Sequence, residues 1–210
     1  MRAPLDLLRR IREAVEPPDP PAREADRLES ARLILRPPRA ADGESWIAVR
    51  RASAEFLQPW EPLWPSDHLG RSSWRRRLSW MRAEMEADRA RFWLLFLRER
   101  REEVVGGLSM TQIRRGAASS AQIGYWMGQA WAGRGLMTEA VAAARTHAFQ
   151  RLGLRRLEAA CLPANLPSQR LLRRLGFQQE GLARGYLEVN GRPEDHLLFS
   201  LLAEDAPLTR

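Results

Sequence analysis

The chain has 210 residues and a formal net charge of +8 at pH 7, and all 34 of its basic residues are arginine. This length is enough for one domain with a real core. The single cysteine, Cys161, excludes an internal disulfide framework. Three scattered histidines give no metal-ligand spacing, and no apolar run is long enough to cross a bilayer. We therefore expect a cytoplasmic protein with no metal and no membrane span.

The basic charge bears on the choice of partners. A basic chain favours anionic partners such as nucleotide cofactors, RNA or a ribonucleoprotein. A solvated basic surface with no partner is the alternative.

The first 27 residues differ in composition from the rest. Four apolar residues recur there at helical spacing: Leu5, Leu8, Ile11 and Val15. The run Pro17–Pro21 cannot continue a helix. We predict a peripheral extension over residues 1–27, a domain over 28–204 and a short tail over 205–210.

The first part of the domain alternates strand and helix signals. Arg32–Arg36 reads as a strand stopped by two prolines, and Asp42 is suited to cap a helix over Gly43–Ala54. Phe56–Pro65 holds two tryptophans among three prolines, which predicts an ordered loop. Its aromatic residues form either a binding wall or plugs over the core. An amphipathic pattern predicts the next helix over Arg71–Arg89.

Three strands joined by short turns come next. Phe92–Leu97 is apolar throughout, which is typical of a strand buried on both faces. Val104–Ile113 contains Gly106 and Gly107, a pair that indicates a bulge or a close backbone contact. Ala121–Met127 is the third strand. The three predict an antiparallel meander.

A glycine-spaced loop follows the third strand. Gly133 and Gly135 lack a Cβ atom, so backbone N–H groups can approach an anion closely, and the helix that follows adds its unpaired N–H groups. Arg134 supplies a permanent positive charge. The loop is therefore either a phosphate cradle or an ordinary turn whose glycines serve packing.

The last part of the chain pairs a parallel strand with a hairpin. The alanine-rich helix after the loop runs to about Gln150, and Arg156–Leu162 is a strand parallel to the one before the loop. Asn165 is suited to cap a helix that Gly176 ends. Short strands are expected at Phe177–Glu180 and Tyr186–Val189. The turn Asn190–Gly191 predicts a hairpin that pairs Tyr186–Val189 with Asp195–Leu202.

These motifs together resemble the GNAT N-acetyltransferase superfamily. The loop AWAGRG matches the family's glycine signature except that Ala130 stands in its first position, and Asn165, Ser168 and the run Leu175–Phe177 match a second family block. FLQPWEP, IGYWMGQAWAGRGLMTEA, RLGFQQEG and YLEVNGRPEDH resemble the RimJ/RimL branch, RimJ above all. The resemblance covers about Leu28 to Leu202. It implies an α/β (α+β) fold: a mostly antiparallel sheet of about six to seven strands with a splayed parallel pair, flanked by about four helices.

The resemblance also implies a donor site for acetyl-CoA. The N–H of Met127 is expected to polarise the thioester oxygen. The diphosphate is expected on the backbone N–H groups of one continuous run: Ala132, Gly133, Arg134, Gly135, Leu136 and Met137. Asn165 would bind the pantetheine arm and Ser168 would face the departing sulfur. A pair that merely caps the helix is the alternative role for Asn165 and Ser168.

The acceptor implied by the RimJ resemblance is the N-terminal alanine of a ribosomal protein. An α-amine has a pKa of about 7.7–8.0, so it demands little of a base. Glu158 and Tyr186 are further catalytic candidates, and Trp60, Glu61 and Trp64 are substrate-binding candidates, with Glu61 also a candidate base. We place selectivity for the acceptor in Phe56–Pro65 and the terminal hairpin.

Two other functions remain open at this stage. The acceptor could be a small amine such as a polyamine or an aminoglycoside, in an enzyme with the same chemistry. The chain could also be a basic module that binds the ribosome or RNA without turnover, with a steep dependence on salt. Ribosome association and the choice between monomer and homodimer are likewise open.

Overall fold

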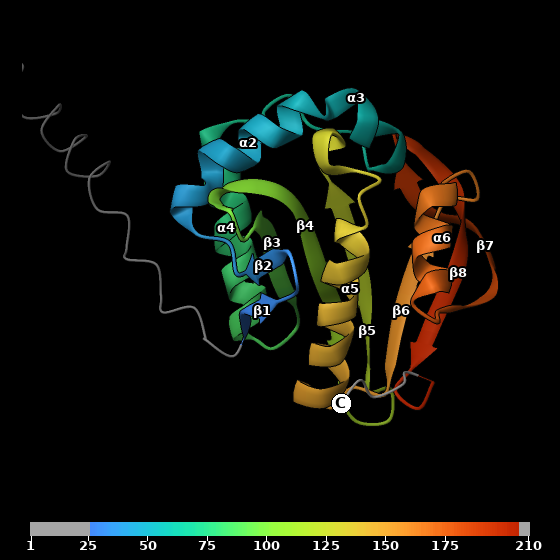
Figure 1. Cartoon of the computed structure of the whole chain (residues 1–210). Coiled ribbons are helices and arrows are strands. Elements are labelled where there is room, and N and C mark those ends of the chain that lie inside the picture. Colours follow the sequence, from blue (N-terminus) through green and yellow to red (C-terminus); the bar gives the residue numbers. More distant parts are fainter. Residues whose placement is uncertain (1–25, 206–210) are drawn as a thin grey trace, which may run out of the picture.

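The fold is organised around one sheet, shown in a computed structural model that describes residues 26–205 (Figure 1). Over this range the sheet has eight strands in the order β1-β2-β3-β4-β5-β6-β8-β7. The strands are β1 Leu28–Glu29, β2 Leu33–Arg36, β3 Arg91–Leu97, β4 Arg100–Arg114, β5 Ser120–Met127, β6 Arg156–Cys161, β7 Gln178–Val189 and β8 Arg192–Leu202. The described α-helices are α2 Gly43–Ala52, α3 Ala54–Leu57, α4 Arg71–Glu86, α5 Leu136–Thr146 and α6 Leu166–Arg174.

The expected fold class is confirmed. Every strand pair is antiparallel except β5–β6, and β3, β4 and β5 form the predicted meander. The described sheet has eight strands where about six to seven were expected, because the two-residue strand β1 adds an edge strand beside β2.

The parallel pair separates part of the way along its length. Partners between β5 and β6 extend only from Ser120–Gln122 to Arg156–Glu158. Beyond them the two strands diverge toward their carboxyl ends, and Figure 1 shows the gap widening toward the top of the view. The splay expected from the resemblance is therefore present, and it leaves part of the β5 backbone without a neighbouring strand.

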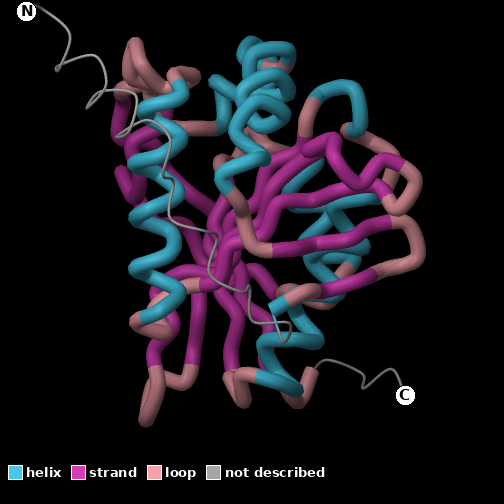
Figure 2. Tube along the Cα trace, turned by 90° about the vertical axis from the view of Figure 1, so that its left-hand side faces the viewer, coloured by secondary structure: helices cyan, strands magenta, loops and turns pink. Residues whose placement is uncertain are grey.

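Helices cover both faces of the sheet (Figure 2). Strand β3 shows why: Trp93 and Leu95 pack into a cluster with α5 and α6, whereas Phe92, Leu94 and Phe96 pack into a second cluster with α2 and α4. Alternate residues of a strand point to opposite faces, so a strand covered on both sides must be apolar throughout. The prediction for this strand is confirmed.

Three predicted elements differ from the structure. The expected loop Phe56–Pro65 begins inside α3 and continues as a short 3₁₀ helix over Gln58–Trp60, because Pro59 lies where a helix needs no N–H donor. The two short strands expected at Phe177–Glu180 and Tyr186–Val189 are one strand, β7, with register shifts between Gln179 and Gly181 and between Ala183 and Leu187. The predicted pairing of Tyr186–Val189 with Asp195–Leu202 is wrong: next to the tight turn, Leu187 to Val189 pair with Arg192 to Glu194, and the later part of β8 pairs with the first part of β7. The helix expected to reach Gln150 ends as α5 at Thr146 and continues as a π-helix.

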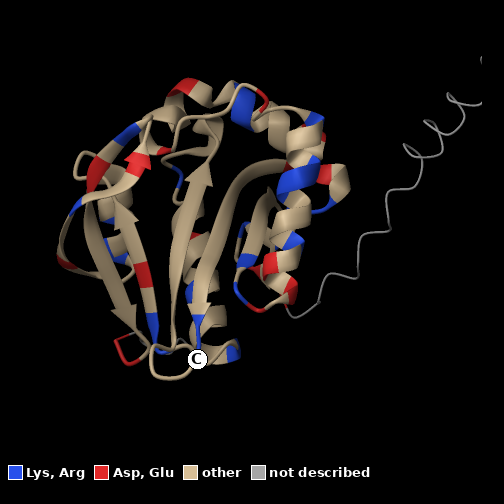
Figure 3. Cartoon of the chain, turned by 180° about the vertical axis from the view of Figure 1, so that it is seen from behind, with Lys and Arg blue, Asp and Glu red and all other residues tan. Residues whose placement is uncertain are grey.

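Charge is distributed rather than concentrated. On the face in Figure 3, blue and red segments alternate along the helix at the right of the molecule, α4. Arg71, Arg76 and Arg89 on or beside α4 pair with Glu44, Asp67 and Glu84 respectively. No helix within residues 26–205 is long and apolar enough to cross a membrane. The amphipathic pattern expected near the N-terminus and most of the C-terminal tail lie outside the described residues.

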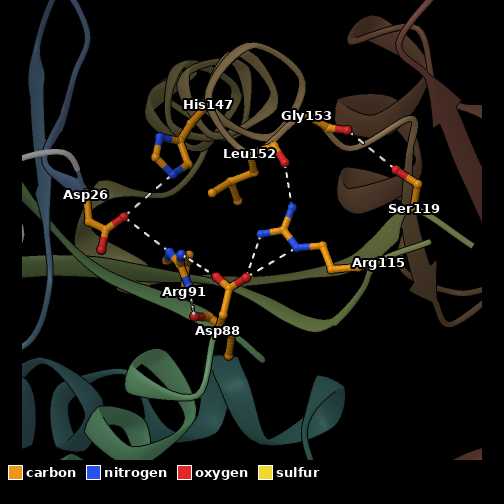
Figure 4. A network of polar contacts seen from close by, with 9 residues as sticks. Asp26, Asp88, Arg91, Arg115, Ser119, His147, Leu152 and Gly153 are labelled. Carbon is orange, nitrogen blue, oxygen red and sulfur yellow. Dashed lines mark hydrogen bonds and ion pairs between the residues drawn. The ribbon is translucent and has the colours of Figure 1, made fainter.

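A buried polar network holds the start of the described chain (Figure 4). Asp26 is buried and accepts a hydrogen bond of 3.2 Å from the Nε of Arg91. The backbone oxygen of Asp26 accepts another, 2.6 Å long, from the indole of Trp93. His147 lies 3.7 Å from the Asp26 carboxylate. Since Asp26 is part of the interior, we propose that the folded unit begins no later than this residue.

Candidate active site

The glycine loop lies between β5 and α5 and has the conformation of an anion cradle. Gly133 and Gly135 have φ angles of +73° and +75°, a region that side chains disfavour. Gly135 is the N-cap of α5, and no side chain caps the helix. The first N–H groups of α5 therefore have no intrahelical acceptor and carry the positive end of the helix dipole.

The surroundings of this loop are open enough for a ligand. A Cβ atom built on Gly133 would meet no other atom within 4 Å, and Gly133, Arg134 and Gly135 are exposed. Beneath the loop, Trp131 packs against Gly128, where an added Cβ would come within 2.9 Å of its ring. Exposed amides, a helix N-terminus and the charge of Arg134 together fit a diphosphate.

The register of β5 directs the N–H of Met127 into the gap beside β6. Met127 faces Gly106 on β4, and the next amide, of Gly128, donates a 2.9 Å hydrogen bond to the oxygen of Val105. This pattern identifies Met127 and Gly106 as a pair without mutual hydrogen bonds, so the N–H of Met127 points away from β4. Its direction suits a donor for a carbonyl oxygen held between β5 and β6.

Ser168 lies in the first turn of α6 with three polar neighbours. Its N–H donates to the Asn165 side-chain oxygen at 3.1 Å, which confirms Asn165 as the helix cap. Its hydroxyl oxygen is 2.8 Å from the phenol oxygen of Tyr125. The same hydroxyl is close enough to the Cys161 thiol to oppose the rise in that thiol's pKa that burial causes. Capping thus uses the backbone of Ser168 and leaves its hydroxyl for other contacts.

Tyr125 is a site residue that the sequence reading did not single out. It precedes Met127 by two positions on β5, so the two side chains share a face of the strand. The two-residue period of a strand could have placed Tyr125 beside Met127 from the sequence alone. Burial raises the pKa of Tyr125 above its usual value, and burial likewise raises that of Cys161. Both groups therefore stay protonated at neutral pH and can serve as neutral hydrogen-bond donors.

On the opposite face of β5, the segment Phe56–Pro65 contacts the β7–β8 hairpin. The N–H of Asn190, in the hairpin turn, donates a 2.9 Å hydrogen bond to the backbone oxygen of Glu61. The Glu61 carboxylate is paired with Arg50 on α2 and accepts a 2.8 Å bond from the indole of Trp64. Trp60, one residue earlier, is 37% exposed. The structure therefore brings together the two segments in which we expect selectivity.

Arg50 connects this segment with the end of β5. Its guanidinium carbon lies 4.5 Å from the ring centroid of Trp64 and 4.9 Å from that of Trp126. One of its nitrogens is 3.3 Å from the Nε2 of His68, which stacks on Trp64. Burial, and then the charge of Arg50, lower the pKa of His68 to about 4, so this imidazole is neutral near pH 7.

Between Gln122 and Trp126 the acceptor face of β5 has no side chain, because Gly124 stands there and is exposed. The amide of Gln122 donates a 3.0 Å hydrogen bond to the phenol oxygen of Tyr186 on β7. Tyr186 therefore borders the same face as Trp126. The hydroxyl of Ser109 on β4 donates a 3.3 Å hydrogen bond to the Gly124 oxygen and lies beside it. The face between Gln122 and Trp126 is therefore lined by small polar groups and not by a bulky side chain.

Glu158 lies away from both sides of the gap. It is on the part of β6 that still pairs with β5, opposite Gln122. Its carboxylate is bound by Arg156 at 2.9 Å and by Arg114 at 3.1 Å. Both carboxylate oxygens are thus occupied by guanidinium groups, so this geometry does not favour Glu158 as a base. In the part of the chain that the structure describes, no cluster of His, Cys, Asp or Glu could hold a metal ion.

Comparison with known proteins agrees with this geometry. Residues 32–178 match the family model described as an acetyltransferase (GNAT) domain. The chain is 32% identical to the probable N-acetyltransferase YjcK of Bacillus subtilis over 85% of its own length and 98% of the relative's. It is 33% identical to the ribosomal protein uS5-alanine N-acetyltransferase of Escherichia coli, with 85% and 92% covered. Mycobacterium smegmatis RimJ, solved in complex with CoA-disulfide, superposes with a TM-score of 0.80 at 36% identity, covering 86% of this chain and 88% of the other.

Proposed function

The chain belongs to the GNAT acetyltransferase family and is an N-acetyltransferase, and we propose that it acetylates the α-amine of a protein N-terminus, in particular the N-terminal alanine of a ribosomal protein. The observation that carries this proposal is the separation of β5 from β6, with a phosphate-type loop on one side and a wall of aromatic and polar residues on the other. The chain aligns with 92% of a relative that is named as a ribosomal-protein alanine N-acetyltransferase, and this similarity supports the choice of acceptor.

Acetyl-CoA is the proposed donor, and it supplies the acetyl group as an activated thioester. The chain's amides from Ala132 to Met137 would bind its diphosphate, and the solved neighbour with CoA-disulfide supports this choice. Asn165 would hold the pantetheine arm. The N–H of Met127 would orient and polarise a carbonyl oxygen in the gap, where a preorganised donor is worth far more than in water.

Ser168 is the proposed hydrogen-bond donor to the departing sulfur, and it would stabilise the thiolate until solvent protonates it. Its hydroxyl is free of the capping contact, and Tyr125 lies within hydrogen-bond distance of the same oxygen. A phenol that stays protonated can donate to Ser168 and so leave the serine hydrogen for the leaving group. Tyr125 is in this account a positioning residue that acts through Ser168.

The acceptor side needs little base chemistry. An α-amine with a pKa of about 7.7–8.0 is roughly a tenth to a fifth neutral at pH 7 and can pass its proton to water. Gln122 and Tyr186, which hydrogen-bond each other, would present polar groups to a peptide beside Gly124. Glu61 is already engaged by Arg50 and Trp64, so we assign it the placement of the wall rather than proton transfer.

A panel of acceptors tests this function. CoA release would be measured with acetyl-CoA and, in turn, peptides that begin with alanine, serine or methionine, peptides with a lysine and a blocked N-terminus, and polyamines. We expect the highest kcat/KM for an alanine-initiated peptide. Faster turnover of a polyamine would move the function to small amines. Binding of RNA without any CoA release would replace the enzyme proposal with a binding module.

A further inference from the structure

Arg32, just before β2, connects the start of the sheet to the donor loop more than a hundred residues later. Its guanidinium donates a 3.0 Å hydrogen bond to the backbone oxygen of Arg134, the residue between the two loop glycines. Its Nε donates a 2.6 Å bond to the carboxylate of Glu139 in the first turn of α5. The N–H of Arg32 and the hydroxyl of Ser30 bind the same carboxylate at 3.2 and 2.9 Å.

The bond to Arg134 fixes the orientation of one peptide plane in the loop. In a trans peptide the C=O of one residue and the N–H of the next point in opposite directions. Holding the Arg134 oxygen on the side of Arg32 therefore directs the N–H of Gly135 to the other side. Gly135 can rotate more freely than other residues, so this plane needs an external contact to stay in place. A reversed plane would present an oxygen to an anion.

Glu139 has a charge that opposes anion binding at this helix end. Partial burial would raise the pKa of Glu139, but hydrogen bonds from Arg32 and Ser30 outweigh it and keep the pKa below its usual range. The carboxylate is therefore ionised at neutral pH, close to the N–H groups that should receive a diphosphate. Arg32 offsets that charge from the side away from the ligand.

We propose that Arg32 and Glu139 are a positioning pair for the donor loop, which together set the Arg134–Gly135 peptide for diphosphate binding. The ligand class rests on the proposed function, namely that the loop receives the diphosphate of a CoA thioester. The pair contributes through the loop's backbone, and its effect is confined to ligands that contain a diphosphate.

Calorimetric titration with two ligands, CoA and pantetheine, tests the pair. Arg32→Gln is expected to weaken CoA binding by about tenfold, the worth of one hydrogen bond to a charged group, and to leave pantetheine binding unchanged. In kinetics, KM for acetyl-CoA rises while kcat at saturation stays within about twofold. The double variant Arg32→Gln/Glu139→Gln should bind CoA more tightly than Arg32→Gln, because the uncompensated carboxylate is gone.

A matched variant and a second readout separate the pair from other causes. Arg27→Gln removes the same charge from an exposed pair with Glu29 and should bind CoA like the wild type. Amide hydrogen exchange of residues 133–137 in the ligand-free protein should be faster in Arg32→Gln than in Arg27→Gln. The proposed positioning role would be overturned by any of three results. These are unchanged amide exchange in Arg32→Gln, equal CoA affinity in the two arginine variants, and equal losses of affinity for CoA and pantetheine. If the wild type fails to bind CoA, the proposed function fails, and the exchange measurement still decides whether Arg32 positions the loop.

Discussion

The hydroxyl of Ser168 has a phenol on one side and a thiol on the other, both of which stay protonated at neutral pH. This environment suits a hydroxyl that donates a hydrogen bond to a departing thiolate rather than one that accepts a proton. It also explains why Cys161 is poorly suited to act as a nucleophile: burial disfavours its thiolate. At the scale of single residues, the donor side of the site is therefore suited to hydrogen-bond donation by neutral groups.

Replacing these residues should separate chemistry from binding. Ser168→Ala is expected to lower kcat by about 10²-fold, at the lower end of positioned acid catalysis, with little change in KM for acetyl-CoA. Tyr125→Phe should lower kcat less. The double variant should match Ser168→Ala, since Tyr125 acts through the serine. Steady-state kinetics with acetyl-CoA varied at saturating peptide is the measurement, and a rise in KM that exceeds the fall in kcat would reduce Ser168 to a binding or capping residue.

At the scale of elements, the acceptor wall is built from segments far apart in the sequence. The chain between α3 and α4 touches the β7–β8 turn through Glu61 and Asn190, and it is held to α2 through Arg50. Glu61 therefore takes part in two contacts at once, one by its backbone and one by its side chain. This double role makes it the residue on which the position of the wall depends.

Glu61→Gln should weaken acceptor binding without affecting the donor. The amide can still accept a hydrogen bond but leaves the buried charge of Arg50 uncompensated, so the segment should loosen. We expect KM for the peptide to rise by about tenfold while the Kd of CoA stays unchanged. Glu55→Gln, on the exposed side of α3, is the control and should behave like the wild type. An equal loss of CoA affinity would show that Glu61 supports the whole fold instead of the acceptor wall.

At the scale of the whole molecule, three histidines are buried, and burial lowers the pKa of two of them, His68 and His147. His68 lies beside Arg50, and His147 lies beside Asp26 and Arg91 near the C-terminal end of α5, where burial lowers its pKa as well. For His68 the folded value of about 4 is below the unfolded value of about 6.5. Between these values the unfolded state binds the proton and the folded state does not, so stability falls as pH falls through this window.

His68→Gln should reduce the acid sensitivity of folding. Glutamine retains an acceptor for Arg50 but cannot titrate. Urea unfolding at pH 7 and pH 5 should show a loss of stability that is about 1–2 kcal/mol smaller in the variant than in the wild type. The variant also loses the stacking on Trp64, but this loss lowers the free energy of unfolding equally at both pH values, so it cancels in the difference. Identical losses in the two proteins would contradict a neutral buried His68.

Local patterns in the sequence were sufficient for much of the fold, and the long-range contacts were not predictable from them. The all-apolar β3, the Asn165 cap and the Asn190–Gly191 turn each depend on neighbours along the chain, and all three are confirmed. The contacts of Tyr125 with Ser168, of Glu61 with Asn190 and of Arg32 with Glu139 join residues that are distant in sequence. No local periodicity carries such information. This is also why Glu158 was a plausible base until its two arginine partners were seen.

The central claim is that the acetyl group reaches an N-terminal α-amine. One peptide that begins with alanine and contains an internal lysine, incubated with acetyl-CoA and the enzyme, offers both amines at equal concentration. Fragmentation of the product by mass spectrometry identifies which nitrogen carries the acetyl group. We expect acetylation of the alanine α-amine alone. Acetyl transfer to the lysine side chain, or no transfer at all, would contradict it.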